Sequence, residues 1–192
     1  MGMDDEPVLE FASRAEWAAW LAAEHSSARA VWIRMPRKAT GIPTVTYAEA
    51  LVEALRFGWI DGQSRGIDDE WHKRRWTPRT ARSKWSKRNV SLAEELIAAG
   101  RMEPAGLREV ERARADGRWA AAYDAASTAT VPDDLAAAFD AEPAARAFFD
   151  TLDSRNRFSV LHRIQDAKRP ETRARRIEKY VAMLAAGEKI HP

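Results

Sequence analysis

The chain has 192 residues, of which 45% are hydrophobic and 31% are charged. This balance is typical of a globular protein and excludes a chain that is disordered throughout. The absence of cysteine excludes disulfide bonds and thiolate metal sites, and no segment holds the ~20 consecutive apolar residues of a membrane span. Residues 1–10 are acidic and lack the apolar core of a secretory signal, so we expect a cytoplasmic protein without membrane insertion.

The first elements in chain order predict alternating strands and helices. Residues 7–11 favour a short strand. A capping box at residues 13–16 is followed by Trp17, Trp20 and Leu21 at helical spacing, which predicts a helix over 14–24. The β-branched apolar run over 30–35 then predicts a buried strand.

The next segment predicts a helix and a hairpin. A second capping box at residues 46–49 begins a helix that ends near Phe57, because Gly58 suits the position that follows a helix. Residues 59–61 favour a strand, and residues 65–77 favour a hairpin that turns at 67–69.

From residue 89 onward the pattern is helical. A third capping box at residues 91–94 predicts a helix that ends near Gly100, and Pro104 and Gly117 mark the ends of the next helix. A linker rich in small residues occupies 120–132. The remaining helices are predicted over 133–141, 143–151, 154–168 and 171–186.

These elements predict an α+β fold. The N-terminal half would hold a small mixed or antiparallel sheet with helices, and the C-terminal half would be helical. We expect an α+β unit over 1–88 and a helical region over 89–192 that packs on it, or one continuous domain.

Positive charge is concentrated in one segment. Residues 71–88 contain eight Lys or Arg residues and no Asp or Glu, which leaves 23 basic against 29 acidic residues elsewhere. Arginine can bind phosphate or carboxylate through two parallel hydrogen bonds, and tryptophan can form the wall of a pocket. The sequence therefore predicts a basic aromatic pocket for a small anionic ligand, with eight candidate residues: Arg75, Trp76, Arg79, Ser83, Lys84, Trp85, Arg88 and Asn89.

Two titratable residues are candidates for proton transfer. Asp61 lies between two glycines and His72 lies beside the basic segment, so they are the catalytic candidates if the protein is an enzyme. The alternative for Asp61 is a structural role, in which it caps a turn or pairs with Arg75. Glu49 and Glu53 share one helix face, but Glu49 belongs to a capping box and Glu53 is predicted to be a surface charge. We therefore predict no metal site and no cofactor.

Two stretches carry a resemblance to a known family. The first contains YAEAL (47–51), FGWIDG (57–62), DDE (68–70), WTPR (76–79) and SKWSKRN (83–89). The second contains AKR (167–169), ETR (171–173), RRI (175–177) and GEK (187–189). In these motifs and their order the chain resembles the YdeI/OmpD-associated family, also called the bacteriocin-protection family.

The resemblance implies a role in tolerance to antimicrobial peptides and an association with an outer-membrane porin, and it implies no particular reaction. Many such peptides are cationic, and residues 71–88 would repel them. Protection is therefore expected to be indirect.

Three functions follow from these observations. The first is a stress-tolerance protein that binds a small phosphate or carboxylate ligand at the basic aromatic pocket. The second is a transferase or hydrolase that acts on an anionic substrate through Asp61 and His72. The third is single-stranded nucleic-acid binding, which interleaved Trp and Arg would suit but which the modest net charge disfavours. The oligomeric state is left open.

Overall fold

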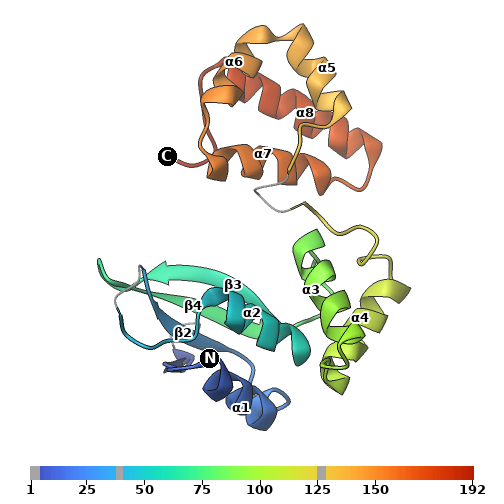
Figure 1. Ribbon diagram of the computed structural model, residues 1–192. Helices are drawn as coiled ribbons and strands as arrows, with labels where there is room; N and C mark the ends of the chain where they lie inside the picture. Colours follow the sequence, from blue (N-terminus) through green and yellow to red (C-terminus); the bar gives the residue numbers. More distant parts are fainter. Residues whose placement is uncertain (1–4, 38–40, 125–128) are drawn as a thin grey trace. The chain divides into compact units, whose positions relative to one another are not determined.

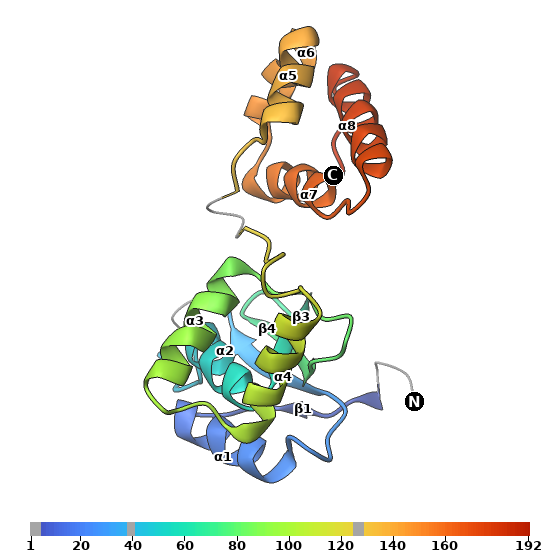
Figure 2. The same ribbon diagram turned by 90° about the vertical axis from the view of Figure 1, so that its right-hand side faces the viewer.

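The computed structural model describes residues 5–37, 41–124 and 129–192. Within these ranges the chain forms eight helices and a four-stranded mixed sheet, which confirms the predicted α+β class (Figures 1 and 2). The chain divides into two compact units. The first contains Met1–Trp85 and Asn89–Ala121, and the second contains Ser86–Arg88 and Ala122–Pro192. Two helices that follow the sheet thus group with it, and the division expected at residue 88 stays a prediction.

The sheet of the first unit has the strand order β1-β2-β4-β3. Its strands are β1 (Val8–Leu9), β2 (Val31–Pro36), β3 (Trp59–Gly66) and β4 (Trp71–Pro78). β1 runs parallel to β2, whereas β4 pairs antiparallel with both β2 and β3. The hairpin predicted within residues 65–77 is therefore present, and its second strand lies in the interior of the sheet.

Helices α1 (Arg14–Glu24) and α2 (Tyr47–Arg56) begin at the predicted caps. Ser13 accepts a hydrogen bond from the Glu16 amide, and Thr46 and Glu49 form a complete capping box.

Tryptophans join α1 to one face of the sheet. The Trp17 ring lies 5.9 Å from Trp76, and the Trp20 ring lies 5.7 Å from Trp59. Aromatic side chains bury large areas and gain further from edge-to-face geometry. The core of the first unit therefore lies between this face and the helices.

Helices α3 (Lys87–Ala98) and α4 (Pro104–Ala115) complete the first unit, although Lys87 and Arg88 group with the second. The third predicted cap was wrong, because α3 begins four residues before Ser91. The Lys87 amide donates to the Tyr123 carbonyl, so a partner distant in sequence satisfies an amide at the helix start. α4 closely approaches the end of α2 at Gly106, where an added Cβ would meet the carbonyl oxygens of Arg56 and Leu55.

The second unit is a helical bundle of α5 (Asp133–Ala141), α6 (Pro143–Thr151), α7 (Ser154–Gln165) and α8 (Pro170–Ala185). Its core consists of Leu135, Phe139, Ala145, Phe149, Val160, Leu161, Ile164, Tyr180 and Leu184.

The C-terminal segment is hydrogen-bonded to α7 of this bundle. The side chain of Asn156 accepts from the amide of His191 and donates to its carbonyl. The linker predicted over 120–132 includes residues 125–128, which lie outside the described residues. Among the helices described, none has the length and apolar character needed to cross a membrane.

The close approach at Gly106 yields a stability prediction. In Gly106→Ala the new Cβ would lie 2.8 Å from the Leu55 carbonyl oxygen and closer still to that of Arg56, so α4 must shift. Overpacking of this kind costs roughly 1–3 kcal/mol, which should outweigh the ~1 kcal/mol that alanine gains in a helix. Urea denaturation should therefore show a lower free energy of unfolding.

Gly62→Ala is the matched control, because its Cβ would meet nothing closer than 3.6 Å. A Gly106→Ala protein as stable as Gly62→Ala would contradict the packing described here.

Candidate functional site

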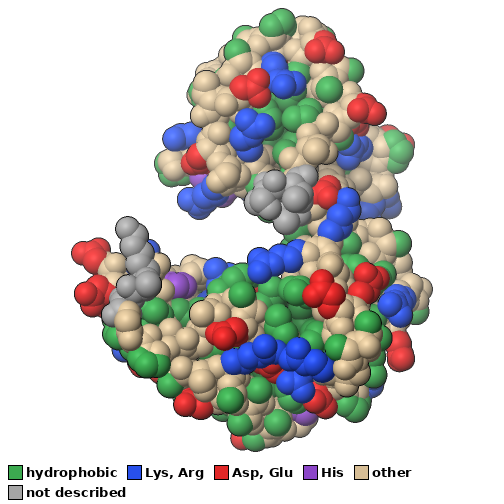
Figure 3. All heavy atoms as spheres, viewed as in Figure 1, with side chains coloured by type: hydrophobic (Ala, Val, Ile, Leu, Met, Phe, Trp, Pro, Cys, Tyr) green, Lys and Arg blue, Asp and Glu red, His purple; other side chains and the backbone are tan. Residues whose placement is uncertain are grey.

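The basic segment 71–88 does not form one surface. Side chains of a β-strand point alternately to opposite faces, so β4 divides its charged residues between the two faces of the sheet. His72, Arg74 and Trp76 lie on the face that α1 and α2 cover, whereas Lys73 and Arg75 lie on the other. On the face drawn in Figure 3, Lys and Arg side chains likewise occur in several separate groups.

Asp61 and His72 share the helix-covered face but are not brought together. Asp61 lies opposite Trp76, and His72 lies four residues before Trp76 in β4. At 3.3 Å per residue, His72 is therefore roughly 13 Å from the position opposite Asp61. The Asp61 carboxylate instead accepts hydrogen bonds from the Tyr47 hydroxyl at 3.1 Å and from Arg74 at 3.0 Å. Burial lowers the pKa of His72, and the positive charges of Arg74 and Arg37 lower it further.

Trp76, which was predicted to form a pocket wall, lies in the core. It is fully buried, with its ring 5.9 Å from that of Trp17 and 6.2 Å from that of Tyr47. An inward-facing position in β4 places the ring among the helices.

The loop after β4 is held together by its own arginine. Arg79 is only 5% exposed, and its guanidinium stacks 3.6 Å from the centre of the Trp85 ring. It also donates to the Lys84 carbonyl at 3.1 Å. Ser83 accepts from the Thr80 amide at 2.9 Å, so its hydroxyl stabilises the turn.

A second arginine, which sequence reasoning missed, holds the same loop. Arg118 donates to the Ser83 carbonyl at 2.8 Å and pairs with Asp116 at 2.7 Å. The Trp119 ring lies 4.8 Å from that of Trp85. These contacts give Arg79, Ser83 and Trp85 structural partners within the loop region.

The last two predicted ligand residues differ in exposure. Arg88 is exposed and groups with the second unit, whereas Asn89 is buried near the start of α3 and groups with the first. Of the eight predicted ligand-binding residues, only Arg75 projects from a strand on the face opposite α1 and α2.

That opposite face carries a row of positive charges. We call it the cationic sheet face and define it by Trp32, Arg34, Arg65, Trp71, Lys73 and Arg75. Lys73 of β4 lies directly opposite Arg34 on β2 and directly opposite Arg65 on β3. Three cations therefore lie side by side across three strands. Like charges in this arrangement repel one another and destabilise a sheet.

Tryptophan rings lie beneath these cations. Trp32 is fully buried, with the Lys73 ammonium 4.9 Å and the Arg65 guanidinium 5.3 Å from its ring centre. The Arg34 guanidinium lies 4.0 Å from the centre of the Trp71 ring. Cation–π attraction of about 0.5–1 kcal/mol per pair offsets part of the repulsion.

Glutamates of the N-terminal segment neutralise part of the charge. Glu6 binds Arg75 through two hydrogen bonds of 2.7 and 2.5 Å and accepts another from the Trp32 indole at 3.0 Å. The hydrogen bond from Arg75 lowers the pKa of Glu6, and the same bond raises the pKa of Arg75. Glu10 pairs with Arg34 at 2.7 Å.

Glu6 and Glu10 thus engage two of the cations of this face, Arg75 and Arg34. In the part of the chain that the structure describes, Lys73 at the centre of the row contacts the Trp32 ring and has no carboxylate partner. The alternation of Trp71, Lys73 and Arg75 with His72, Arg74 and Trp76 predicted two partly polar faces for this strand. Arg34 and Arg65 were missed, because the register that places them beside Lys73 joins strands that are distant in the sequence.

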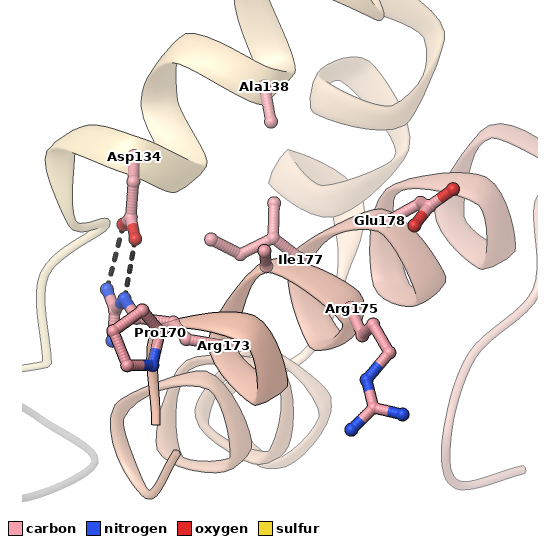
Figure 4. A pocket seen from close by; sticks show the side chains of 8 residues that line it. Asp134, Ala138, Pro170, Arg173, Arg175, Ile177 and Glu178 are labelled. Carbon is pink, nitrogen blue, oxygen red and sulfur yellow. Dashed lines mark hydrogen bonds and ion pairs between the residues drawn. The ribbon is translucent and has the colours of Figure 1, made fainter. Parts of the chain in front are cut away.

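A groove in the second unit lies between α5 and α8 (Figure 4). At one end, Arg173 donates two hydrogen bonds to Asp134, at 2.5 and 2.8 Å. Figure 4 shows Arg175 and Glu178 directed away from this pair. Because Asp134 neutralises Arg173 and the pKa of Asp134 is lowered by that contact, the groove is not the stronger anion site. Within the described ranges, no group of three or more His, Asp or Glu side chains could hold a metal ion.

The Glu6–Arg75 pair yields a prediction of pH dependence. A carboxyl group with a lowered folded-state pKa stabilises the fold above its unfolded-state pKa, and this contribution disappears as the pH falls through the folded-state value. Glu6→Gln should therefore lower the free energy of unfolding by roughly 1–2 kcal/mol at neutral pH. Chemical denaturation across acidic pH should show the two proteins converging.

Glu10→Gln is the control. The Glu10 side chain is 56% exposed, against 18% for Glu6, so its loss should cost about 0.5 kcal/mol or less. A gap between wild type and Glu6→Gln that stays constant at acidic pH would contradict the assigned pair.

Comparison with known families assigns the two parts of the chain separately. The family model described as "Bacteriocin-protection, YdeI or OmpD-Associated" matches residues 128–187, which confirms the resemblance predicted from the sequence. The first stretch of that resemblance, 47–89, lies instead within residues 9–109, which match the model described as "Domain of unknown function (DUF8412)". No curated protein and no solved structure matches the chain significantly. Since residues 9–109 exceed half of its length, the chain belongs to the DUF8412 family and carries a C-terminal segment that matches the bacteriocin-protection family.

Proposed function

We propose that the protein binds an anionic ligand on the cationic sheet face, with a phosphate or carboxylate group above Lys73. The observation that carries this proposal is the in-register row of Arg34, Lys73 and Arg65 across three adjacent strands. Such a row is destabilising by itself. An anion above its centre would interact favourably with all three cations.

The side chains of the row favour an oxyanion. Arg34 and Arg65 flank Lys73 and can each offer a planar fork of donors, whereas the lysine supplies a compact charge between them. Glu6 and Glu10 engage Arg75 and Arg34 at one side of the face. The centre of the row, at Lys73, is therefore where a compact anionic ligand is best placed.

The same face gives little support to single-stranded nucleic acid. Binding of that kind relies on bases stacking on exposed aromatic rings. Trp32 and Trp71 are buried, and the cations that would bind phosphate lie above them. An enzyme that uses Asp61 and His72 as a pair is also disfavoured, because Asp61 is engaged by Tyr47 and Arg74.

The name of the family matched by residues 128–187 suggests a cellular setting. We propose that the protein acts in tolerance to bacteriocins or related peptides. It would do so by binding an anionic ligand and not by capturing the peptide. The cationic sheet face would repel a cationic peptide but would attract an anionic metabolite or signal.

Substitution of Lys73 tests the proposed function. Lys73→Met removes the central charge while keeping an apolar stem over Trp32, so the affinity for pyrophosphate or citrate should fall roughly tenfold, about 1.4 kcal/mol. Isothermal titration calorimetry at low salt is the measurement. The wild-type affinity should itself decrease as salt is added.

Lys84→Met is the matched control, because Lys84 is an exposed lysine of the same basic segment and lies in the loop between β4 and α3. Equal loss of affinity in both variants would indicate a general charge effect. Unchanged affinity in Lys73→Met, or no binding by the wild type, would overturn the proposal.

A further inference from the structure

A second group of arginines lies in the first unit, away from the cationic sheet face, around a buried carboxylate. Glu53 of α2 is only 1% exposed, so the prediction that it is a surface charge was wrong. Its two oxygens contact three guanidinium groups: Arg14 at 2.5 Å, Arg56 at 2.5 Å and Arg101 at 3.8 Å. The side chain is buried because the arginines that cover it come from distant parts of the sequence.

The three arginines come from three different elements. Arg14 begins α1, Arg56 ends α2, and Arg101 lies in the segment between α3 and α4. That segment is held in place by Arg56, which donates to the Arg101 carbonyl at 2.8 Å and to Glu103 at 2.8 Å. The absence of a side chain at Gly106 permits α4 to approach α2 closely. On the face drawn in Figure 3, Lys and Arg side chains gather where Figure 1 places the end of α2.

The cluster has more donors than acceptors. Three guanidinium groups face two carboxylates, those of Glu53 and Glu103. Arg56 uses its Nε and both terminal nitrogens within the cluster. In the part of the chain that the structure describes, one terminal nitrogen of Arg14, Nη2, is shielded from solvent and has no hydrogen-bond partner, so it adds to the excess of donors without being open to a ligand. The donor capacity that can reach a ligand therefore lies on the solvent-exposed parts of the Arg14 and Arg101 side chains.

Arg14 and Arg101 are held close together by one atom. Both contact the same oxygen of Glu53, so the two contacting nitrogens are no further apart than the sum of 2.5 and 3.8 Å. The single hydrogen of Arg14 Nε is donated to Glu53, so a phosphate group placed between the two guanidinium groups would accept hydrogen bonds from Nη1 of Arg14 and from Arg101. The Arg101 side chain is 48% exposed, so its donors are accessible to a ligand from solvent.

We infer that Arg14 and Arg101 form a binding site for a phosphate group, and that Glu53 is the positioning residue that orients both. Two like charges beside one carboxylate leave an excess of positive charge, which a bound oxyanion neutralises. Arg56 fixes the segment that carries Arg101 and does not itself contact the ligand. This inference does not depend on the function proposed for the cationic sheet face, because the two sites share no residue.

The experiment is a titration of the full-length protein with inorganic phosphate at constant ionic strength, maintained with sodium chloride. Nuclear magnetic resonance signals of the arginine Nε–H groups report each site separately. Phosphate is expected to shift the signals of Arg14 and Arg101, and Arg101→Gln should weaken this binding at least tenfold. Because Arg101 makes only a long contact with Glu53, this variant should unfold at the same urea concentration as the wild type.

Two controls separate this site from other effects. Arg112→Gln removes another half-exposed arginine of the first unit, which pairs with Glu109, and should leave phosphate binding unchanged. Lys73→Met should also leave the Arg14 signal responsive, even if the cationic sheet face fails to bind any ligand. Phosphate that shifts neither Arg14 nor Arg101, or that binds Arg101→Gln as tightly as wild type, would overturn the inference and identify the cluster as a structural tie alone.

Discussion

The arrangement of the first unit depends on the position of β4 in the interior of the sheet. A strand paired on both sides must direct successive side chains to opposite faces, and here the two faces have different surroundings. Trp76 completes an aromatic core with α1, whereas Lys73 and Arg75 lie above Trp32 with the N-terminal segment. One short basic sequence therefore contributes to both the core and a charged surface.

The same geometry explains how charge is tolerated beside the core. Arg74 faces the helices, where Asp61 accepts its hydrogen bond and the Tyr47 ring lies 4.6 Å from its guanidinium. Arg79 is buried against Trp85 and donates to a carbonyl. Buried guanidinium groups are stable only where acceptors or aromatic faces surround them. Each of these arginines has one such acceptor and one aromatic ring beside it.

Local signals in the sequence were sufficient for most of the fold. The caps at Ser13 and Thr46 each involve residues within four positions, so their patterns predicted the starts of α1 and α2. The start of α3 could not be found in this way, because the Lys87 amide is satisfied by Tyr123. Local patterns predict elements well where the stabilising contacts are themselves local.

The candidate sites were harder to predict for the same reason. Arg75 is paired with Glu6, which lies 69 positions away, and Arg14 is paired with Glu53 across 39 positions. Proximity in sequence brought Arg75 and Arg79 into one hypothesis, although strand alternation and the following loop give them separate surroundings. A high density of Lys and Arg in the sequence indicates that cations are abundant in a segment. The fold determines which carboxylates, aromatic rings or ligands those cations contact.

The two family matches correspond to different parts of this architecture. Residues 9–109 lie almost entirely within the first compact unit, and residues 128–187 lie within the second. Both the cationic sheet face and the Glu53 cluster belong to the first unit, whereas the name that refers to bacteriocin protection comes from the match to the second. The activity of the first unit must therefore be established from its own residues. The family name matched by the second unit carries no information about ligands of the first unit.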